Sequence, residues 1–196
     1  MKGFDYFTTL IKEKVLKNYH YRPFDRFLKR HFKGEIIGAE IGVLEGFHAE
    51  SMLHHLPIKK LYLIDPYINY EGYDCYTRMG LDHHFKVAKN KLDYYGNRKE
   101  FVKKKFQDAL DDIPDNLDFI YYDISANTER IKQFFDLYYP KLKENGVIGG
   151  WNYIARHHEV PRAVFDIMDK YGLELHGDGS DWWMIKKTKT KTKSKK

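Results

Sequence analysis

The chain has 196 residues, of which 42% are hydrophobic and 16% aromatic, and its formal net charge is +6. This length supports one well-buried core and is short for two domains, while the aromatic content excludes a disordered chain. Cys75 is the only cysteine, which excludes an intrachain disulfide framework. No segment resembles a signal peptide or a membrane span, so we expect a cytoplasmic protein with no membrane partner.

The positive charge is concentrated at the carboxyl end of the chain. Seven of the 34 basic residues lie between Lys186 and Lys196, a stretch without acids, which leaves 27 basic and 28 acidic side chains elsewhere. Alternating lysine and threonine offer no apolar side chain to bury, which predicts a disordered tail over residues 186–196. The tail indicates nucleic-acid binding only weakly, since charge runs are usually solvated.

Hydrophobic spacing predicts helices that alternate with strands. Apolar residues recur at helical spacing over residues 4–15 and 24–32, and Pro23 is placed to begin the second helix. The pattern then predicts strands at 36–41, 60–64, 100–106, 117–122 and 146–150, helices near 47–55, 79–95, 127–139 and 159–171, and a terminal hairpin of 173–176 and 181–185 around a turn at 177–179. This alternation requires mostly parallel strands with right-handed crossovers, so the predicted fold is a doubly wound α/β sheet.

A glycine-rich turn connects the first of these strands to the following helix. Gly42 and Gly46 allow positive φ and let a ligand approach the main-chain N–H groups. Asp65 ends the next strand, from which a carboxylate can accept hydrogen bonds from both hydroxyls of a ribose. The glycines are spaced G-x-x-x-G rather than G-x-G-x-x-G, and Glu40 disfavours a pyrophosphate. The turn therefore predicts a nucleotide-type cofactor without phosphates.

On these motifs the chain resembles the class I S-adenosylmethionine-dependent methyltransferases, especially their small O-methyltransferase-like branch. The likeness covers about residues 34–185 and is carried by Glu40 to Gly46, Leu61 to Tyr67, Asp118 to Asp123 and Lys141 to Gly150. It implies S-adenosylmethionine as the cofactor. It also implies a Rossmann-like, mostly parallel seven-stranded domain over residues 35–185, with N-terminal helices over residues 1–34 that cap the site.

The resemblance places the cofactor at the carboxyl ends of the strands, where a doubly wound sheet binds its ligand. Glu40, Gly42 and Gly46 are expected to hold the methionine half of the cofactor, and Asp65 the ribose. Gln107 and Asp108 are expected near the adenine, and Asp123 beside the methyl donor.

The expected catalytic residues are less regular than the cofactor motifs. Related enzymes commonly have a Gly-Asn-His-like segment and a His-Asp pair where this chain has Ile-Ser-Ala after Asp123 and Trp-Asn after the fifth strand. Asp123 and Asn152 are expected side by side, facing the methyl donor and orienting an acceptor hydroxyl. They also offer two oxygen ligands to Mg²⁺ or another divalent cation, although such a cation generally requires more charge than one carboxylate. Without a metal, His157 or His158 is the candidate base.

The acceptor is indicated only by the surroundings of the site. An aromatic and acidic loop from Tyr67 to Tyr76 lies beside the cofactor acid, and such a loop can stack on sugars, phenols or bases. The leading hypothesis is O-methylation of a small molecule or a glycan hydroxyl. A catalytically degenerate, cofactor-binding regulator and a tail-assisted nucleic-acid methyltransferase are the alternatives, and the sequence leaves the oligomeric state open.

Overall fold

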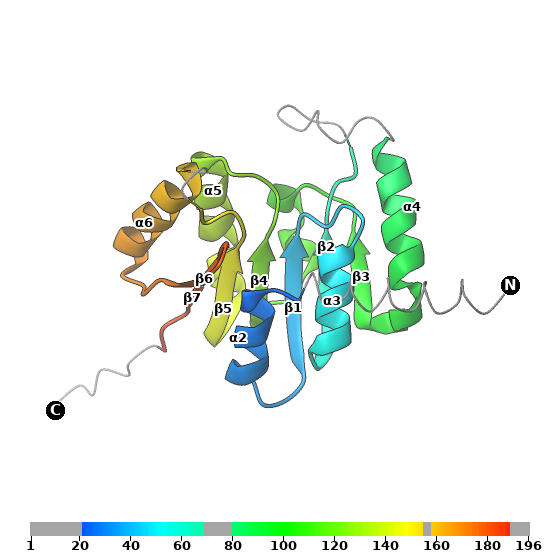
Figure 1. The fold of residues 1–196 in the computed structure, drawn as a ribbon, viewed down its shortest axis with the longest axis horizontal. Coiled ribbons are helices and arrows are strands. Elements are labelled where there is room, and N and C mark those ends of the chain that lie inside the picture. Colours follow the sequence, from blue (N-terminus) through cyan, green and yellow to red (C-terminus); the bar gives the residue numbers. More distant parts are fainter. Residues whose placement is uncertain (1–20, 69–79, 155–157, 189–196) are drawn as a thin grey trace, which may run out of the picture.

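The fold alternates strands and helices along the chain (Figure 1). The computed structural model describes residues 21–68, 80–154 and 158–188. The α-helices in these ranges are α2 (Pro23–His31), α3 (Phe47–His55), α4 (Leu81–Leu92), α5 (Thr128–Tyr138) and α6 (Glu159–Tyr171). The strands are β1 (Ile36–Ile41), β2 (Ile58–Ile64), β3 (Lys99–Val102), β4 (Leu117–Tyr122), β5 (Leu142–Gly150), β6 (His176–Asp178) and β7 (Asp181–Ile185). Short 3₁₀ segments are η2 (Asp93–Arg98), η3 (Phe106–Asp108), η4 (Leu110–Asp112) and η5 (Tyr139–Lys141).

The described strands form one seven-stranded sheet in the order β3-β2-β1-β4-β5-β7-β6. Strands β1 to β5 are parallel, whereas β7 runs antiparallel to β5 and β6 antiparallel to β7. The chain winds outward from β1 to β3 and then returns to the other side of β1 to form β4. The predicted doubly wound sheet with an antiparallel terminal hairpin is confirmed, and its winding reverses between β1 and β4, where such sheets bind ligands.

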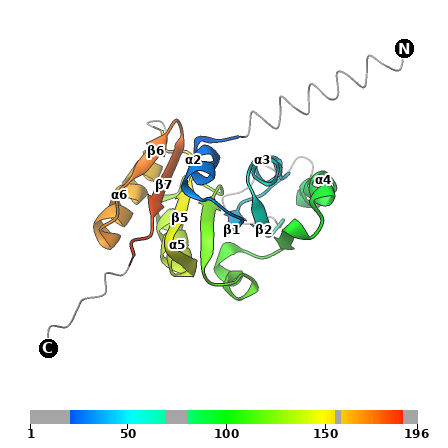
Figure 2. The same ribbon diagram turned by 90° about the horizontal axis from the view of Figure 1, so that it is seen from below.

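Helices cover both faces of the sheet and make a three-layer arrangement (Figure 2). The residues of β4 are all buried and alternate between two apolar cores. Phe119 and Tyr121 pack on the side of α2, α3 and α4, whereas Ile120 and Tyr122 pack on the side of α5 and α6. A strand buried on both faces favours a largely apolar sequence, and β4 is apolar except for Asp118. Among the described helices, none combines the length and apolarity needed to cross a bilayer.

Most of the predicted boundaries agree with the structure, and the exceptions have local causes. The strand expected at 100–106 ends at Val102, because three exposed lysines follow and Phe106 begins a 3₁₀ turn. Strand β5 begins at Leu142, earlier than predicted, because Asn145 adopts φ +61 and lets the strand bulge without ending. The first hairpin strand, β6, lies later than predicted and includes two residues of the expected turn.

The two ends of the chain also differ from expectation. The helix predicted over residues 4–15 lies outside the described residues. The expected start of the tail at Lys186 is too early, because the main chain of Lys186 exchanges hydrogen bonds with Asn145 and Gly146 of β5. The Nζ of Lys186 also donates to carbonyl oxygens of η5 and of the first residue of β5. The folded region therefore continues beyond the predicted domain limit at residue 185.

Deleting residues 186–196 should destabilise the protein more than deleting residues 189–196. The longer deletion removes the main-chain and Nζ hydrogen bonds of Lys186, which together contribute on the order of 1–3 kcal/mol. The shorter deletion keeps them and removes only alternating polar residues. Thermal unfolding of both truncations beside the full chain measures the difference. Equal melting temperatures would show that the contacts of Lys186 contribute nothing to stability.

Candidate functional site

A cavity of about 670 Å³ opens at the carboxyl ends of β1, β2 and β4. Its wall contains the loop after β1, the first turn of α3 and the residues that follow β2, β3 and β4. Five of the predicted site residues are part of this wall, namely Glu40, Gly42, Asp65, Gln107 and Asp123. Gly46 stands between the wall residues Glu45 and Phe47. The fold therefore brings most of the expected cofactor residues together around one space.

The loop after β1 depends on its glycines for two reasons. Gly42 has φ +90, and a Cβ there would lie 2.3 Å from the carbonyl oxygen of Asp123 at the end of β4. Gly46 has φ +73 and is the residue from which α3 begins. Both conformations disfavour L side chains, and Gly42 is also required by the close approach of a neighbouring strand. The contact that excludes a side chain at Gly42 is thus with β4 itself.

The Asp65 carboxylate binds this loop from the end of β2. Its Oδ2 accepts hydrogen bonds from the main-chain N–H groups of Val43 and Leu44, both at 3.0 Å. Its Oδ1 accepts from the N–H of Tyr67 at 2.9 Å. Because a carboxylate offers about four lone-pair sites, these three bonds leave capacity for a further donor. Asp65 therefore shapes the loop in addition to any contact with a ligand.

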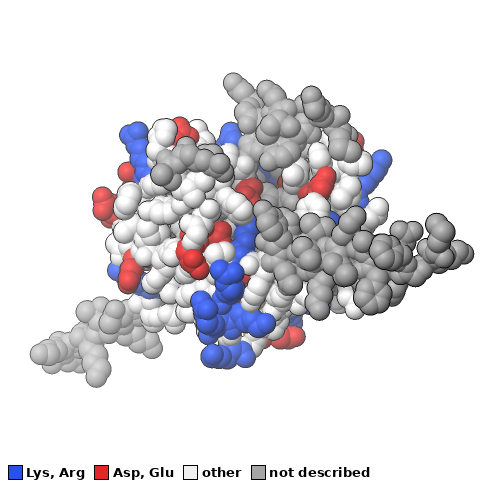
Figure 3. All heavy atoms as spheres, viewed as in Figure 1, with Lys and Arg blue, Asp and Glu red and all other residues white. Residues whose placement is uncertain are grey.

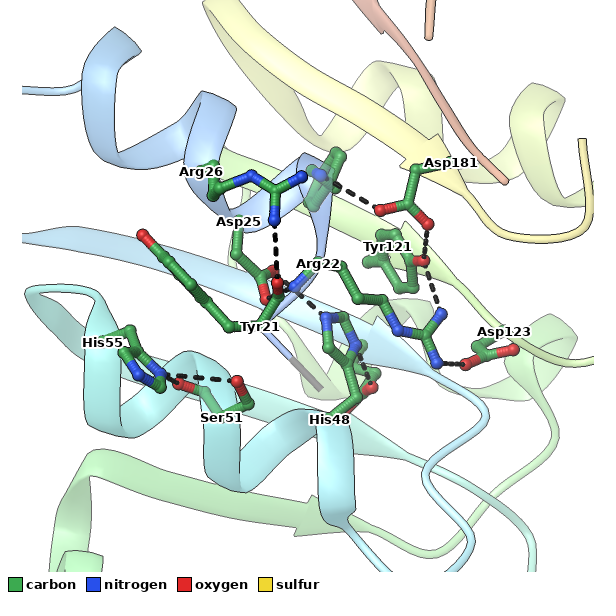
Figure 4. A network of polar contacts seen from close by, with 12 residues as sticks. Tyr21, Arg22, Asp25, Arg26, His48, Ser51, His55, Tyr121, Asp123 and Asp181 are labelled. Carbon is green, nitrogen blue, oxygen red and sulfur yellow. Dashed lines mark hydrogen bonds and ion pairs between the residues drawn. The ribbon is translucent and has the colours of Figure 1, made fainter. Parts of the chain in front are cut away.

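Glu40, His48 and Asp25 form a buried chain of charges that joins β1, α3 and α2. His48 Nδ1 lies 2.8 Å from Glu40 Oε1, and His48 Nε2 lies 3.1 Å from Asp25 Oδ1 (Figure 4). All three residues are at most 5% exposed. Burial acts to lower the pKa of His48, but the neighbouring carboxylates, Asp25 foremost, raise it to about 9. Both ring nitrogens therefore carry protons at neutral pH and donate to the two acids.

One atom of this chain of charges is left without a partner. Glu40 Oε2 is buried and has no hydrogen-bond donor among the described residues. Burial raises the pKa of the Glu40 carboxyl, while His48 opposes that rise. A buried acceptor in this state is stabilised by any positively charged donor that reaches it. Glu40 is also part of the cavity wall, so a ligand cation is the natural donor.

Arg22, the residue before α2, extends its side chain between Tyr121 and Asp123 (Figure 4). Its guanidinium donates to the Tyr121 hydroxyl at 2.7 Å and to Asp123 Oδ2 at 3.0 Å. Burial acts to lower the pKa of Arg22, but Tyr121 and Asp123 outweigh it and raise this pKa above its ordinary value. A permanent positive charge therefore lies in the cavity wall beside the acid that ends β4.

Besides Gly46, which stands between two wall residues, three predicted site residues do not line the cavity. Asp108 is exposed beyond β3. Asn152 has φ +67, and its carbonyl oxygen accepts a main-chain hydrogen bond from two residues on, so it forms a turn after β5. His158 is exposed at the start of α6. His157 and the part of the aromatic loop from residue 69 onward lie outside the described residues.

The surroundings of Asp123 do not fit a divalent cation. Asp123 is paired with Arg22, and Asn152, the second expected ligand, is not in the cavity wall. In the described ranges, no three His, Cys, Asp or Glu side chains converge as a metal site. A hard cation takes roughly six oxygen ligands, several of them charged, and one neutralised carboxylate does not provide them.

The site residues that the sequence did not reveal are those with distant partners. Arg22 binds Asp123 from 101 positions away, and Tyr121 donates to Asp181 from 60 positions away. No motif spacing or periodicity connects such pairs. His48 stands two residues after Gly46, yet its burial between two acids depends on how α2 packs. The one available signal was the position of Arg22 directly before a helix that begins with proline.

A doubly wound sheet with a glycine loop and a strand-end acid beside one cavity is the arrangement expected of the class I S-adenosylmethionine-dependent methyltransferases. A family model described as a methyltransferase domain matches residues 39–151, more than half of the chain. The chain therefore belongs to this methyltransferase family, which confirms the predicted enzyme class and cofactor. No curated protein matches the sequence.

Solved structures share the fold at low sequence identity. A protein from Corynebacterium glutamicum is 13% identical, with a TM-score of 0.65 and coverage of 96% of this chain and 99% of the other. The O-methyltransferase NovP is 20% identical, with a TM-score of 0.60 and coverage of 89% and 80%. An O-methyltransferase from Bacillus cereus in complex with SAH is 16% identical, with a TM-score of 0.61 and coverage of 84% and 82%.

The cavity wall fits S-adenosylmethionine. This cofactor has no phosphate, and its methionine half carries an ammonium group near a positively charged sulfur. The wall contains the acids Glu40, Asp65 and Asp123, together with Arg22 and His48, which pair with two of them. The unpartnered Glu40 Oε2 is an acceptor for an ammonium group, and Asp65 has capacity for a hydroxyl donor.

The substitution His48→Gln should remove a pH-dependent part of the stability. The pKa of His48 is raised to about 9 in the folded state, against about 6.5 in an unfolded chain. Its contribution is therefore complete below about pH 6.5 and is lost as the pH rises through about 9. Across this interval the free energy of unfolding of the parent should fall by on the order of 3 kcal/mol.

Urea unfolding at about pH 6.5 and at about pH 9 measures the fall in the free energy of unfolding. This fall should be much smaller in His48→Gln than in the parent. The exposed His54 of the same helix provides the control, because His54→Gln should keep the parent's pH dependence. If parent and His48→Gln lose stability equally with rising pH, His48 is not charged in the folded protein.

Proposed function

We propose that this methyltransferase transfers the methyl group to a hydroxyl oxygen of a small molecule or a glycan. The observation that carries the proposal is the cavity wall, on which the cofactor loop and Asp123 meet at the ends of the neighbouring strands β1 and β4. The likeness in fold to proteins named as O-methyltransferases favours oxygen as the acceptor atom. A cavity of this size is typical of sites for small ligands.

In this proposal, each part of the cofactor has its own residues on the wall. Glu40 and the loop from Gly42 to Gly46 bind the methionine half, Asp65 binds a ribose hydroxyl, and Gln107 lies toward the adenine. When bound, S-adenosylmethionine supplies a methyl group on a positively charged sulfur, to which the acceptor oxygen bonds as the carbon–sulfur bond breaks. Apolar side chains from α3, β2 and α4 line the rest of the cavity and exclude water from the acceptor.

The segment before β1 closes the site in this proposal. The N-terminal cap predicted over residues 1–34 and the methyltransferase domain predicted from residue 35 are parts of this proposal, and residues 1–20 lie outside the described residues. The ion pair between Arg22 and Asp123 supports this role for the described part of the segment. A small acceptor enters such a covered space more readily than a macromolecule does, which agrees with the proposed acceptor class.

Nucleic acid is the less supported acceptor. Lys and Arg side chains gather over α2 (Figure 3), whose last turn contains Lys29 and Arg30. That turn leads into β1 at the amino ends of the parallel strands, whereas the cavity opens at their carboxyl ends (Figure 1). A polyanion attracted to these charges therefore lies at the opposite edge of the sheet from the methyl donor.

The substitution Asp65→Ala should weaken S-adenosylmethionine binding by about 1.5–3 kcal/mol. The variant loses charge-assisted hydrogen bonding to the ribose. It also loses the carboxylate that orders the loop after β1. Isothermal titration calorimetry measures the dissociation constant. Asp108→Ala is the matched control, since Asp108 is exposed and outside the wall, and its dissociation constant should equal the parent's. A folded Asp65→Ala variant that binds as tightly as the parent would remove Asp65 from the cofactor site.

An acceptor screen with S-adenosylmethionine labelled in its methyl group tests the proposed reaction. Phenols, sugars, oligosaccharides and nucleic acids are assayed separately, with and without Mg²⁺. We expect the label in methyl ethers of a small molecule or an oligosaccharide. Label in nucleic acid would favour a tail-assisted nucleic-acid enzyme, and cofactor binding without transfer to any class would favour a catalytically degenerate regulator.

A further inference from the structure

We propose that the Arg22 guanidinium, rather than a divalent cation, supplies the positive charge that stabilises the acceptor oxygen at the Asp123 end of the cavity. This inference rests on the methyl transfer to a hydroxyl proposed above. It gives a catalytic role to a residue outside the methyltransferase motifs and removes the need for a metal ion.

Contacts on three sides hold the Arg22 guanidinium in the cavity wall. Asp123 and Tyr121 accept its hydrogen bonds, and the ring centre of Trp151 lies 3.6 Å from its central carbon. The Arg22 side chain is only 11% exposed, although it lines the cavity. A carboxylate, a phenol and an indole ring leave this cation little freedom to leave the site when a ligand enters.

A second row of contacts fixes the partners of Arg22. The Tyr121 hydroxyl donates to Asp181 Oδ1 at 2.8 Å, and Asp181 Oδ2 accepts from the N–H of Phe24 at 3.0 Å. Phe24 lies in the first turn of α2, two residues after Arg22, so the network closes on itself (Figure 4). A charge held in this way is already oriented when negative charge develops on a reacting atom.

The same contacts explain why a metal ion does not fit. The Asp123 carboxylate is paired with the guanidinium, which removes the negative charge that would attract Mg²⁺. The residue that follows β5 is Trp151, whose ring stacks on the guanidinium and offers no ligand atom. Arg22 and Trp151 therefore act together: the guanidinium occupies the position beside Asp123 that a metal ion would take, and the indole ring covers the guanidinium.

The guanidinium has donors to spare for an acceptor. It carries five N–H groups, whereas the two hydrogen bonds described above use one on each terminal nitrogen. Its Nε is buried and has no partner among the described residues, so the second N–H of each terminal nitrogen is left for an acceptor. The positive charge lowers the pKa of a hydroxyl that binds beside it, so the acceptor releases its proton to bulk water as it enters the site and is held there as an oxygen anion paired with Arg22. The other ionisable groups near Arg22 are Asp25, Glu40, His48, Tyr121, Asp123 and Asp181.

Direct titration with Mn²⁺ tests the absence of a metal site. Electron paramagnetic resonance follows free Mn²⁺ as the full-length protein is added in the presence of S-adenosylhomocysteine. We expect no stoichiometric binding, and we expect chelation by EDTA to leave turnover unchanged. Binding of one equivalent of Mn²⁺ that Asp123→Asn abolishes would overturn the proposal, and this outcome needs no acceptor.

Variants of Arg22 test the catalytic role with the acceptor found in the screen. Arg22→Ala should lower kcat/KM by roughly 100- to 1,000-fold and move its pH profile upward by about one pH unit or more. Guanidinium ion added to Arg22→Ala should restore about tenfold or more, and Arg22→Lys, which keeps the charge, should lose less. Arg26→Ala is the matched control, because Arg26 lies on the same helix and pairs with Asp178 at the surface. It should behave as the parent.

A merely structural role for Arg22 gives different results. Thermal unfolding and the affinity for S-adenosylhomocysteine show whether each variant is folded and still holds its cofactor. Folded variants with an unshifted pH profile and no rescue by guanidinium would refute the catalytic role. If Arg22→Ala does not fold, the pH profile of Arg22→Lys decides the question. A parent protein that methylates no acceptor refutes the proposed function instead, and the Mn²⁺ titration still decides whether Asp123 belongs to a metal site.

Discussion

The ion pair between Arg22 and Asp123 connects the segment before β1 to the end of the central strand β4, and the site is arranged around it. The Arg22 side chain is 11% exposed and the Asp123 side chain 29% exposed, so the pair is partly removed from water. Loss of Asp123 would leave the mostly buried guanidinium without its charged partner, which is costly in a medium of low polarity. The position of α2 is therefore coupled to the chemistry of the cavity.

The buried charges behind the cavity wall do not cancel, and one carboxylate oxygen among them has no donor. Within the described residues, four carboxyl groups share two cations in this network: Asp25, Glu40, Asp123 and Asp181 with Arg22 and His48. Burial raises the pKa of Asp181 and of Glu40, which reduces part of the excess negative charge. The cavity wall also contains the basic Lys105 and Arg130, so the match to the cofactor depends on the unpartnered Glu40 Oε2, which can accept from an ammonium group.

The elements that were predictable from sequence are those whose pattern reflects the geometry of the sheet. Strands β1 and β4 are buried on both faces, so their sequences are apolar except for Glu40 and Asp118. Helix α3 begins at the glycine that adopts positive φ, and α6 has an amphipathic spacing that ends at Gly172. The predicted start of β5 was wrong because it depended on the backbone conformation of one residue, Asn145.

The cofactor half of the site was predictable because its parts are adjacent in sequence. Gly42 and Gly46 stand in one turn, and Asp65 ends the next strand, so short-range spacing places them at the same edge of a parallel sheet. The expected pair of Asp123 and Asn152 was not predictable in this way, since a left-handed turn at Asn152 takes it out of the cavity wall.

The sequence by itself therefore determined the fold class, the methyltransferase family and the cofactor loop, because each depends on periodicity or on spacing within a few dozen residues. Only the tertiary structure decided which cation stands beside Asp123, and that His48 is charged between two acids. These contacts join residues up to 101 positions apart and form only when α2 packs against the sheet. Burial is the physical reason, because a charge removed from water is stable only beside a suitable partner. Local sequence patterns do not show which distant residue that partner is.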